Sequence, residues 1–464
     1  MPAKHRLASL LIAGGVFLST MDSSMVNVAL PGIMRAFQVS LAEVKLVVLV
    51  YLMVITLSLA LWGRVGDALG KGNVYVAGLA IFALGALACA VSGTFFLLIG
   101  FRALQAAGAA MMMANGPAIV KLVSPRQHLG KTLGFIGIAT SCGLMSGPLL
   151  SGIIISVVSW RGVFLVLVPL AVLIVMLGLK FMLPGLRSSE SREHQPFDWS
   201  GGILWALFVG LFVLLTNGSV RPWYLYLLLV GALGMALLLF LKAERRAVAP
   251  ILPLVLVRKR YYWTSVASAA ISFAALFIVL ILLPFYLDYI LCYPIERIGL
   301  VMMALPVSLV VISPLSGWLY DRLGSARLIA TSGLVLSGGA VLSMLQLDSA
   351  SHFAEVFWRL TLLGAGQSIF LAPNSASVLI RVKDTSAGIA SGILATARNF
   401  GMLTGTALAG TGFGLLYGHL AQGESILEYS AGRAEAFLLA QRLTLAMALL
   451  LLLGGCLISW SRGR

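Results

Sequence analysis

Apolar runs of about 20 residues recur along the whole chain, and a run of that length can cross the hydrocarbon core of a bilayer as a helix. Only 10% of the residues are charged, whereas about a quarter are charged in a soluble globular domain. The sequence therefore predicts a polytopic, all-helical membrane protein. We expect fourteen spans, near residues 7–30, 44–62, 73–92, 95–120, 132–157, 161–183, 199–217, 223–242, 263–287, 297–318, 327–346, 355–380, 386–416 and 436–460.

The formal charge of +16 arises mainly from loops on one side of the predicted membrane. The loops on the side of the N-terminus carry Arg64, Lys71, Lys121, Arg126, Lys131, Arg187, Arg192, Arg245, Arg246, Arg258, Lys259, Arg260, Arg322, Arg327, Arg381 and Lys383. The opposite loops carry few basic residues, chiefly Arg35, Lys45, Arg161, Arg221, Arg297 and Arg433. By the positive-inside rule, both termini lie in the cytoplasm and the chain sits in the inner (plasma) membrane. No aromatic and basic stripe for stacking bases is present, so nucleic acid is not an expected partner.

The N-terminal apolar run imitates a secretory signal peptide but is predicted to be a retained first span. The segment Asn27 to Pro31 is not a small-residue cleavage site, and the run exceeds the apolar part of a usual signal. The four cysteines are scattered and never form a Cys-x-x-Cys pair. We therefore expect no disulfide framework and no zinc site, and no other metal or cofactor.

A charged, Gly-rich loop occurs twice and indicates a duplicated chain. It covers Gly63 to Val76 and returns at Gly317 to Arg327, each time between two apolar runs. Asp67 and Asp321 lie 254 residues apart, although six spans with short links need only about 200 residues. The excess fits one extra helical hairpin. We predict a six-helix bundle over 1–183, linkers with a hairpin (199–217 and 223–242) over 184–262, and a second six-helix bundle over 263–464.

Four motifs, in order along the chain, carry a resemblance to a known family. The first span reads Met21-Asp22-Ser23-Ser24-Met25-Val26-Asn27-Val28-Ala29-Leu30-Pro31, and the loop after the second span carries Gly63, Gly66, Asp67, Gly70 and Lys71. The fourth span carries Leu98, Arg102, Gln105 and Gly108, and the fifth carries Gly143, Gly147, Pro148, Ser151 and Gly152. The chain resembles the major facilitator superfamily over essentially its whole length, and its fourteen-span drug:proton antiporter branch in particular. It departs from the family pattern at Ala68, Gly72, Ala106 and Ser151.

The resemblance implies two pseudo-symmetric six-helix bundles plus a central hairpin, and a proton-coupled exporter that works by alternating access. We expect amphipathic substrates, cationic or aromatic, with protons and membrane lipid as the other partners, and a monomer. Export of a specific metabolite, siderophore or lipid stays open, as does a non-transporting membrane sensor. Import of a small solute is disfavoured by the antiporter-like fifth span. An enzyme is not expected, because neither His-Glu-x-x-His nor Gly-x-Ser-x-Gly occurs.

Asp22 is the main candidate for proton and substrate coupling, because it lies past the middle of its span. An unpaired charge is costly there, and burial favours the protonated form of a carboxyl group. The alternative is a carboxyl group that permanently hydrogen-bonds Ser or Asn on a neighbouring helix. Arg102 keeps its charge and would either act on a nearby carboxylate or tie helices together, with Gln105 as a possible partner. The resemblance implies a part in proton coupling for Arg102, and Asn27 and Gln105 complete this set.

The two Gly-rich loops are candidate cytoplasmic gates. The resemblance implies that Asp67, with Gly63, Arg64, Gly70 and Lys71, forms a latch on the cytoplasmic side. The alternative is a plain helix-hairpin turn that the glycines alone define. Asp321 and Arg322 occupy the second copy, where the latch role is less favoured.

Gly143, Gly147, Pro148 and Gly152 share one side of the fifth span at spacings near four, so they predict a close helix crossing and a hinge. Asp288, near the outer end of the ninth span, is either a second acidic site or a solvated helix end, and we favour the latter. Arg398 and Asn399 in the thirteenth span are assigned to packing of the core.

Overall fold

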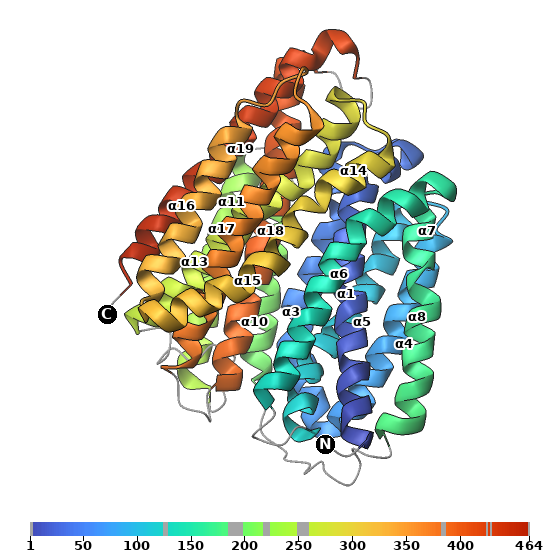
Figure 1. The fold of residues 1–464 in the computed structure, drawn as a ribbon, viewed down its shortest axis with the longest axis vertical. Helices are drawn as coiled ribbons and strands as arrows, with labels where there is room; N and C mark the ends of the chain where they lie inside the picture. The colour runs from blue at the N-terminus through green and yellow to red at the C-terminus, as the bar shows by residue number, and fades with distance from the viewer. Residues whose placement is uncertain are drawn as a thin grey trace. The chain divides into compact units, whose positions relative to one another are not determined.

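The computed structural model describes residues 3–123, 129–183, 198–216, 223–247, 259–381, 387–423, 426 and 429–462, and every regular element in these residues is helical (Figure 1). The predicted loop residues Arg126, Arg187, Arg192, Arg221, Arg258 and Lys383 lie outside the described residues. The same holds for most of the two predicted linkers, at 184–197 and 248–258.

The chain forms two compact units. The first comprises Met1–Ala29, Leu46–Phe212 and Tyr224–Ile251. Its helices are α1 (Ala3–Phe37, which continues into the second unit), α3 (Leu46–Leu69), α4 (Lys71–Ala90), α5 (Phe95–Val123), α6 (Leu129–Val157), α7 (Trp160–Leu165), α8 (Leu167–Leu177), a π-helical turn (Gly178–Met182), α10 (Trp199–Thr216) and α11 (Trp223–Arg246).

The second unit comprises Leu30–Lys45, Val213–Trp223 and Leu252–Arg464. Its helices are α2 (Leu41–Val44), α13 (Arg260–Phe285), a π-helical turn (Tyr286–Ile290), α14 (Ile295–Met302), α15 (Ala304–Leu323), α16 (Ala326–Met344), α17 (Phe353–Leu379), α18 (Ala387–Leu420), a 3-10 turn (Ala431–Arg433) and α19 (Ala434–Trp460). The outer end of α1 therefore packs with a unit whose other residues are mostly more than 200 positions later in the sequence. The division into two six-helix bundles and a hairpin stays a prediction.

Each predicted span falls on a described helix or on consecutive helices, such as α7 with α8 for 161–183 and α14 with α15 for 297–318. Within the described residues, ten helices are long and apolar enough to cross a membrane. The all-helical membrane class is thus confirmed. The number fourteen stays a prediction.

Both units use the same kind of helix contact, in which glycine lets two backbones meet. In the first unit, a Cβ atom on Gly78 of α4 would lie 2.9 Å from the carbonyl oxygen of Gly108 on α5. In the second, a Cβ atom on Gly333 of α16 would lie 2.6 Å from the carbonyl oxygen of Gly366 on α17. Gly333 and Gly366 follow Gly78 and Gly108 by 255 and 258 residues. The duplication inferred from the loops therefore extends to the packing of the helices.

Candidate proton-coupling site

A buried polar cluster connects α1 to α5 in the first unit. The Asp22 side chain is 0% exposed and that of Arg102 is 1% exposed. Nη1 of Arg102 donates to both carboxylate oxygens of Asp22 at 3.0 Å, and to Oε1 of Gln105 at 2.7 Å. Nε2 of Gln105 donates to Oδ1 of Asp22 at 3.2 Å. The carboxylate, the guanidinium and the amide thus form a closed hydrogen-bonded triangle.

The remaining contacts of Arg102 come from α3 and α7. Its Nε donates to the backbone carbonyl of Val47 at 3.2 Å. Its guanidinium carbon lies 4.2 Å from the ring centroid of Tyr51 and 5.4 Å from that of Phe164. The hydroxyl of Tyr51 in turn lies 3.4 Å from Oγ of Ser19 on α1. Aromatic faces stabilise a cation at these distances, so four helices together hold one charge pair away from water.

This geometry corrects the sequence-based hypothesis of a lone acid in the membrane, because Asp22 has a fixed basic partner. The physical reason is that the faces of α1 and α5 that carry Asp22 and Arg102 pack together, although the residues are 80 positions apart. The attraction within a buried ion pair offsets the desolvation of its two ions, whereas removing one charge leaves the other unpaired at a cost of about 3–5 kcal/mol. Any proton that binds Asp22 must therefore also change the surroundings of Arg102.

Of the four residues predicted for coupling, the structure brings together Asp22, Arg102 and Gln105. Asn27 is buried on α1, but its Oδ1 has no hydrogen-bond partner among the described residues, and no contact joins it to the cluster. Tyr51 and Val47 were missed. Tyr51 is an aromatic residue within an apolar run, and nothing in the sequence distinguishes it from the others. Val47 contributes only its backbone carbonyl, which the sequence cannot single out.

The other side of α1 packs closely against α6, at the residues predicted for the hinge. A Cβ atom on Gly143 would lie 2.6 Å from the carbonyl oxygen of Phe17, and one on Gly147 would lie 3.1 Å from that of Met21. Ser151 donates to the carbonyl of Met25 at 3.0 Å. Pro148 and Gly152 are buried in the same helix. The close crossing is present, and the hinge role stays a prediction.

Replacing Gly143 with Ala is expected to lower the stability of the protein by about 1–3 kcal/mol, because the new methyl group meets backbone that must move. Thermal unfolding in detergent measures this effect. Gly100→Ala on α5 is the matched control, since a Cβ atom there meets nothing within 4 Å. Equal melting temperatures for the two variants would contradict the packing argument.

A sequence model described as the Major Facilitator Superfamily matches residues 12–406, which is most of the chain. The chain belongs to the Major Facilitator Superfamily. It is accordingly a multi-pass membrane transporter with a small-molecule substrate, and its family and fold are those of transporters and not of enzymes.

Relatives within this superfamily differ in what their names say they carry. The chain is 32% identical to the riboflavin transporter RibZ of Clostridioides difficile (strain 630) over 401 residues, 86% of each chain. It is 30% identical to the uncharacterized transporter YebQ of Escherichia coli (strain K12) over 412 residues, 88% of this chain and 89% of YebQ. It is 29% identical to the multidrug resistance protein Stp of Mycobacterium tuberculosis (strain CDC 1551 / Oshkosh) over 417 residues, 88% of this chain and 76% of Stp.

Two solved transporter structures share the fold of this chain. A bacterial homolog of the human lysosomal transporter Spinster, inward-facing and unoccupied, aligns with a TM-score of 0.72 at 14% identity and covers 100% of this chain and 98% of its own. The peptide transporter POT in complex with sulfate aligns with a TM-score of 0.71 at 13% identity, over 98% and 96% of the two chains. At these identities the likeness concerns the fold alone.

In this superfamily member, the first Gly-rich loop forms a tight turn between α3 and α4. Lys71 donates to Asp67 at 2.5 Å, one helical turn away, and Gly70 has a φ of 96° that favours glycine. Gly66 leaves room for Asn115 on α5, whereas a Cβ atom on Gly63 would meet nothing. The ion pair of Asp67 is thus local to the turn, and its role as a latch stays a prediction.

The second copy of the loop has no such pair among the described residues. Asp321 is exposed, and Arg322 lies over the ring of Trp318 at 4.7 Å. Gly324 ends α15 with a φ of 61°. These contacts define a turn, which agrees with the weaker expectation for this loop.

Two charged residues near the outer ends of the spans differ from their sequence-based interpretations, and both belong to the second unit. Asp288 was favoured as a solvated helix end, which is wrong, because its side chain is 14% exposed and accepts a hydrogen bond from Arg35 at 2.6 Å. Lys45 was assigned to an outer loop but is fully buried next to α18. Its Nζ donates to Oγ1 of Thr411, and Gly410 leaves room for its methylenes. Packing of α2 on α18 explains this burial.

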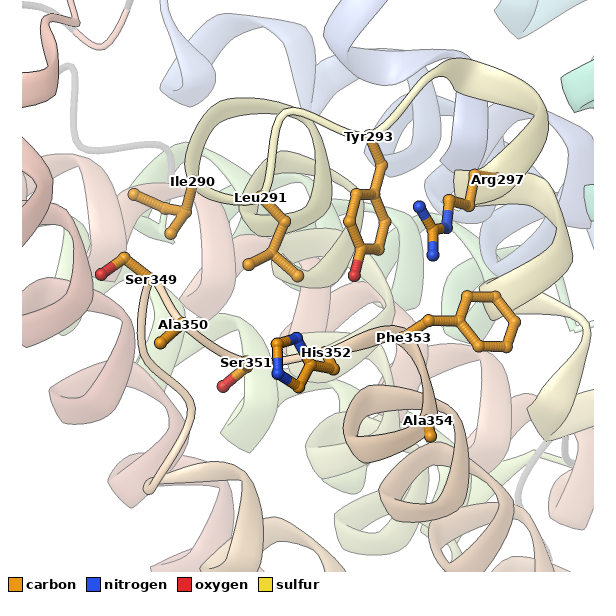
Figure 2. A pocket seen from close by; sticks show the side chains of 10 residues that line it. All are labelled: Ile290, Leu291, Tyr293, Arg297, Ser349, Ala350, Ser351, His352, Phe353 and Ala354. Atoms are coloured by element: carbon orange, nitrogen blue, oxygen red, sulfur yellow. The ribbon is translucent and has the colours of Figure 1, made fainter.

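A hollow of about 650 Å³ lies at the end of the second unit where α14 and α17 begin (Figure 2). Figure 2 shows the side chains of Tyr293 and Arg297 directed toward His352 across this space. Arg297 lies over the ring of Tyr293 at 4.5 Å. Arg297 and His352 are both exposed, so this is a surface hollow rather than an interior site.

Proposed function

We propose that this transporter exports amphipathic aromatic compounds in exchange for protons, by alternating access, and that it belongs to the fourteen-span drug:proton antiporter branch. It would act in the plasma membrane with both termini in the cytoplasm. The observation that carries the proposal is the buried cluster of Asp22, Arg102 and Gln105. A titratable acid inside a membrane transporter is by default a functional group. Asp22 pairs with Arg102 on α5, for which the family resemblance implies a part in proton coupling.

The cluster gives a physical route from proton binding to a change of conformation. With Asp22 ionised, the cluster is neutral overall and stable without water. When Asp22 takes up a proton, Arg102 keeps only neutral acceptors, the amide of Gln105 and the carbonyl of Val47. A lone guanidinium is better solvated where water reaches it. Proton binding therefore favours a conformation that admits water to the cluster, and each event promotes the other by the same free energy.

The contact of α1 with α6 extends this effect to the helix packing. Asp22 holds α1 to α5, while Ser24 donates to the carbonyl of Gly143 at 3.3 Å on the other side. Weakening the Asp22 contact loosens α1 from α5 and leaves its contact with α6 in place. The glycine-lined crossing then supplies a surface on which α1 can tilt, which is how we interpret the predicted hinge residues.

The second candidate is transport of one aromatic metabolite rather than many drugs. It is favoured by the 32% identity to RibZ over 86% of each chain, because RibZ is named as a riboflavin transporter. The same proton-coupling cluster serves either substrate range, so the two candidates differ only in specificity.

Transport into proteoliposomes tests the proposal. The vesicles are prepared with an acidic lumen. Copies of the protein that insert inside out have their extracellular side facing this lumen, so the lumen corresponds to the outside of the cell. We expect uptake of an aromatic test compound, riboflavin or ethidium, together with a rise in lumenal pH. Collapse of the proton gradient with nigericin should stop accumulation. Uptake that persists without the gradient, or that moves no protons, would overturn proton coupling, and a preference for riboflavin alone would favour the metabolite candidate.

A further inference from the structure

Arg398 in the second unit is a cation that has no counterion among the described residues. It is the twelfth residue of the 34-residue helix α18, about 17 Å from the start of that helix at 1.5 Å per residue. Its side chain is only half-buried, yet its Nε is buried and has no hydrogen-bond partner among the described residues. Nη2 donates to Oγ of Ser375 on α17 at 2.6 Å, and the ring centroid of Phe273 on α13 lies 6.0 Å from its guanidinium carbon.

Two other interior arginines are neutralised by acids. Arg102 pairs with Asp22, and Arg359 pairs with Glu355 at 3.1 Å. Within the described part of the chain, no carboxylate forms an ion pair with Arg398. The internal duplication does not place a counterpart of Asp22 in the second unit either. Gly401 and Gly405 follow Gly143 and Gly147 by 258 residues, and the same offset from Asp22 leads to Leu280.

A second arginine, which forms no ion pair among the described residues, contacts the same segment of α17. Arg462 is 3% exposed and donates to Ser377 at 3.1 Å and to Oδ1 of Asn374. Burial and the neighbouring Arg381 lower the pKa of Arg462 to about 10, so it stays charged at neutral pH. Two guanidinium groups therefore flank Asn374 to Ser377, and neither forms an ion pair with an acid in the part of the chain that the structure describes. The positive electrostatic potential of these two groups attracts an anion.

We propose that Arg398, beside the ring of Phe273, recognises an anionic group of the transported compound, so that the substrate is an amphipathic aromatic anion. A guanidinium with free donors binds the oxygens of a carboxylate, sulfonate or phosphate, and Phe273 offers an apolar face beside it. This inference rests on the proposed transport function. It replaces both the cationic substrate and the packing role of Arg398 that the sequence suggested.

The charge of the cargo has a consequence for energetics. An anion that leaves while one proton enters moves two charges in the same electrical direction, so an inside-negative potential drives export. A monovalent cation exchanged for one proton moves no net charge. Dependence on membrane potential thus distinguishes the two substrate classes without knowledge of the natural compound.

The test uses naphthalene compounds that share one aromatic body and carry a sulfonate, no charge or a trimethylammonium group. Binding to the purified full-length protein is measured by fluorescence, and transport is measured in proteoliposomes with and without a potassium diffusion potential. We expect the wild type to bind the sulfonate at least about tenfold more tightly than the ammonium compound, and to transport it faster when the potential is imposed. Arg398→Gln should remove this preference, and Arg398→Lys should keep part of it.

Two controls separate recognition from other roles of arginine. Ser375→Ala removes the contact between α17 and α18 but leaves the charge, so it should keep the sulfonate preference. If the role of Arg398 were only to tie these helices, Ser375→Ala would behave like Arg398→Gln. Arg297→Gln tests the surface hollow, which also contains an arginine, and should leave the preference unchanged.

The proposal is overturned if the wild type binds no member of the set, prefers the ammonium compound or shows no preference. It is equally overturned if Arg398→Gln keeps the sulfonate preference, or if Arg297→Gln removes it. Proton movement in the same vesicles is scored separately. Export of ammonium compounds in exchange for protons would leave the proposed function intact while contradicting this inference.

Discussion

Asp22→Asn is expected to reduce proton-driven transport to the level of protein-free vesicles. The amide cannot exchange a proton, and it leaves the guanidinium of Arg102 buried with neutral acceptors only. Loss of one member of a buried ion pair costs about 3–5 kcal/mol, so the melting temperature should also fall. Transport driven by a pH gradient, together with thermal unfolding in detergent, measures both effects on the same preparation.

Glu43→Gln is the matched control, because it makes the same change of acid to amide at an exposed site. Glu43 caps α2 through its contacts with Ser40, and glutamine serves in the same capping arrangement. We expect wild-type transport and stability for this variant. If Asp22→Asn also keeps its response to the proton gradient, the cluster is not the site of proton coupling.

The double variant Asp22→Asn with Arg102→Gln is expected to separate stability from coupling. Replacing both partners of a buried ion pair by neutral groups is often close to neutral for stability, whereas removing either partner alone is strongly destabilising. The double variant should therefore melt at a higher temperature than either single variant. Its transport should still fail to respond to protons, because no carboxyl group is left in the cluster.

The interaction free energy from this double-mutant cycle measures the strength of the pair. A value near zero, with additive losses of stability, would mean that Asp22 and Arg102 do not depend on each other in the folded protein. That result would remove the physical basis for coupling proton binding to a conformational change. Transport and stability are measured independently. A variant that is stable but inactive supports the mechanism. For an unstable variant, the melting temperature measures the contribution of the pair to stability.

Several features of this protein followed from the sequence alone, because they depend on local pattern. Apolar runs of the length of a bilayer determined the helical membrane class, and the recurrence of the Gly-rich loop indicated a duplication. The glycines of the fifth span predicted a close crossing, since residues near four apart share a helix face. Arg102 and Gln105, three residues apart on α5, were likewise expected to act on one side of that helix.

The tertiary structure decided which charges have partners. Helix periodicity shows which residues share a face, but the rotation and register of two packed helices determine what that face meets. Asp22 therefore has a cation 80 positions away in the sequence, and Asp288 has Arg35, 253 positions away. Lys45 is buried against α18, whereas Arg398 has no acid beside it among the described residues. In a low-dielectric interior, the chemical behaviour of a charged group depends on its nearest opposite charge. The distance to that charge is set only when the chain folds.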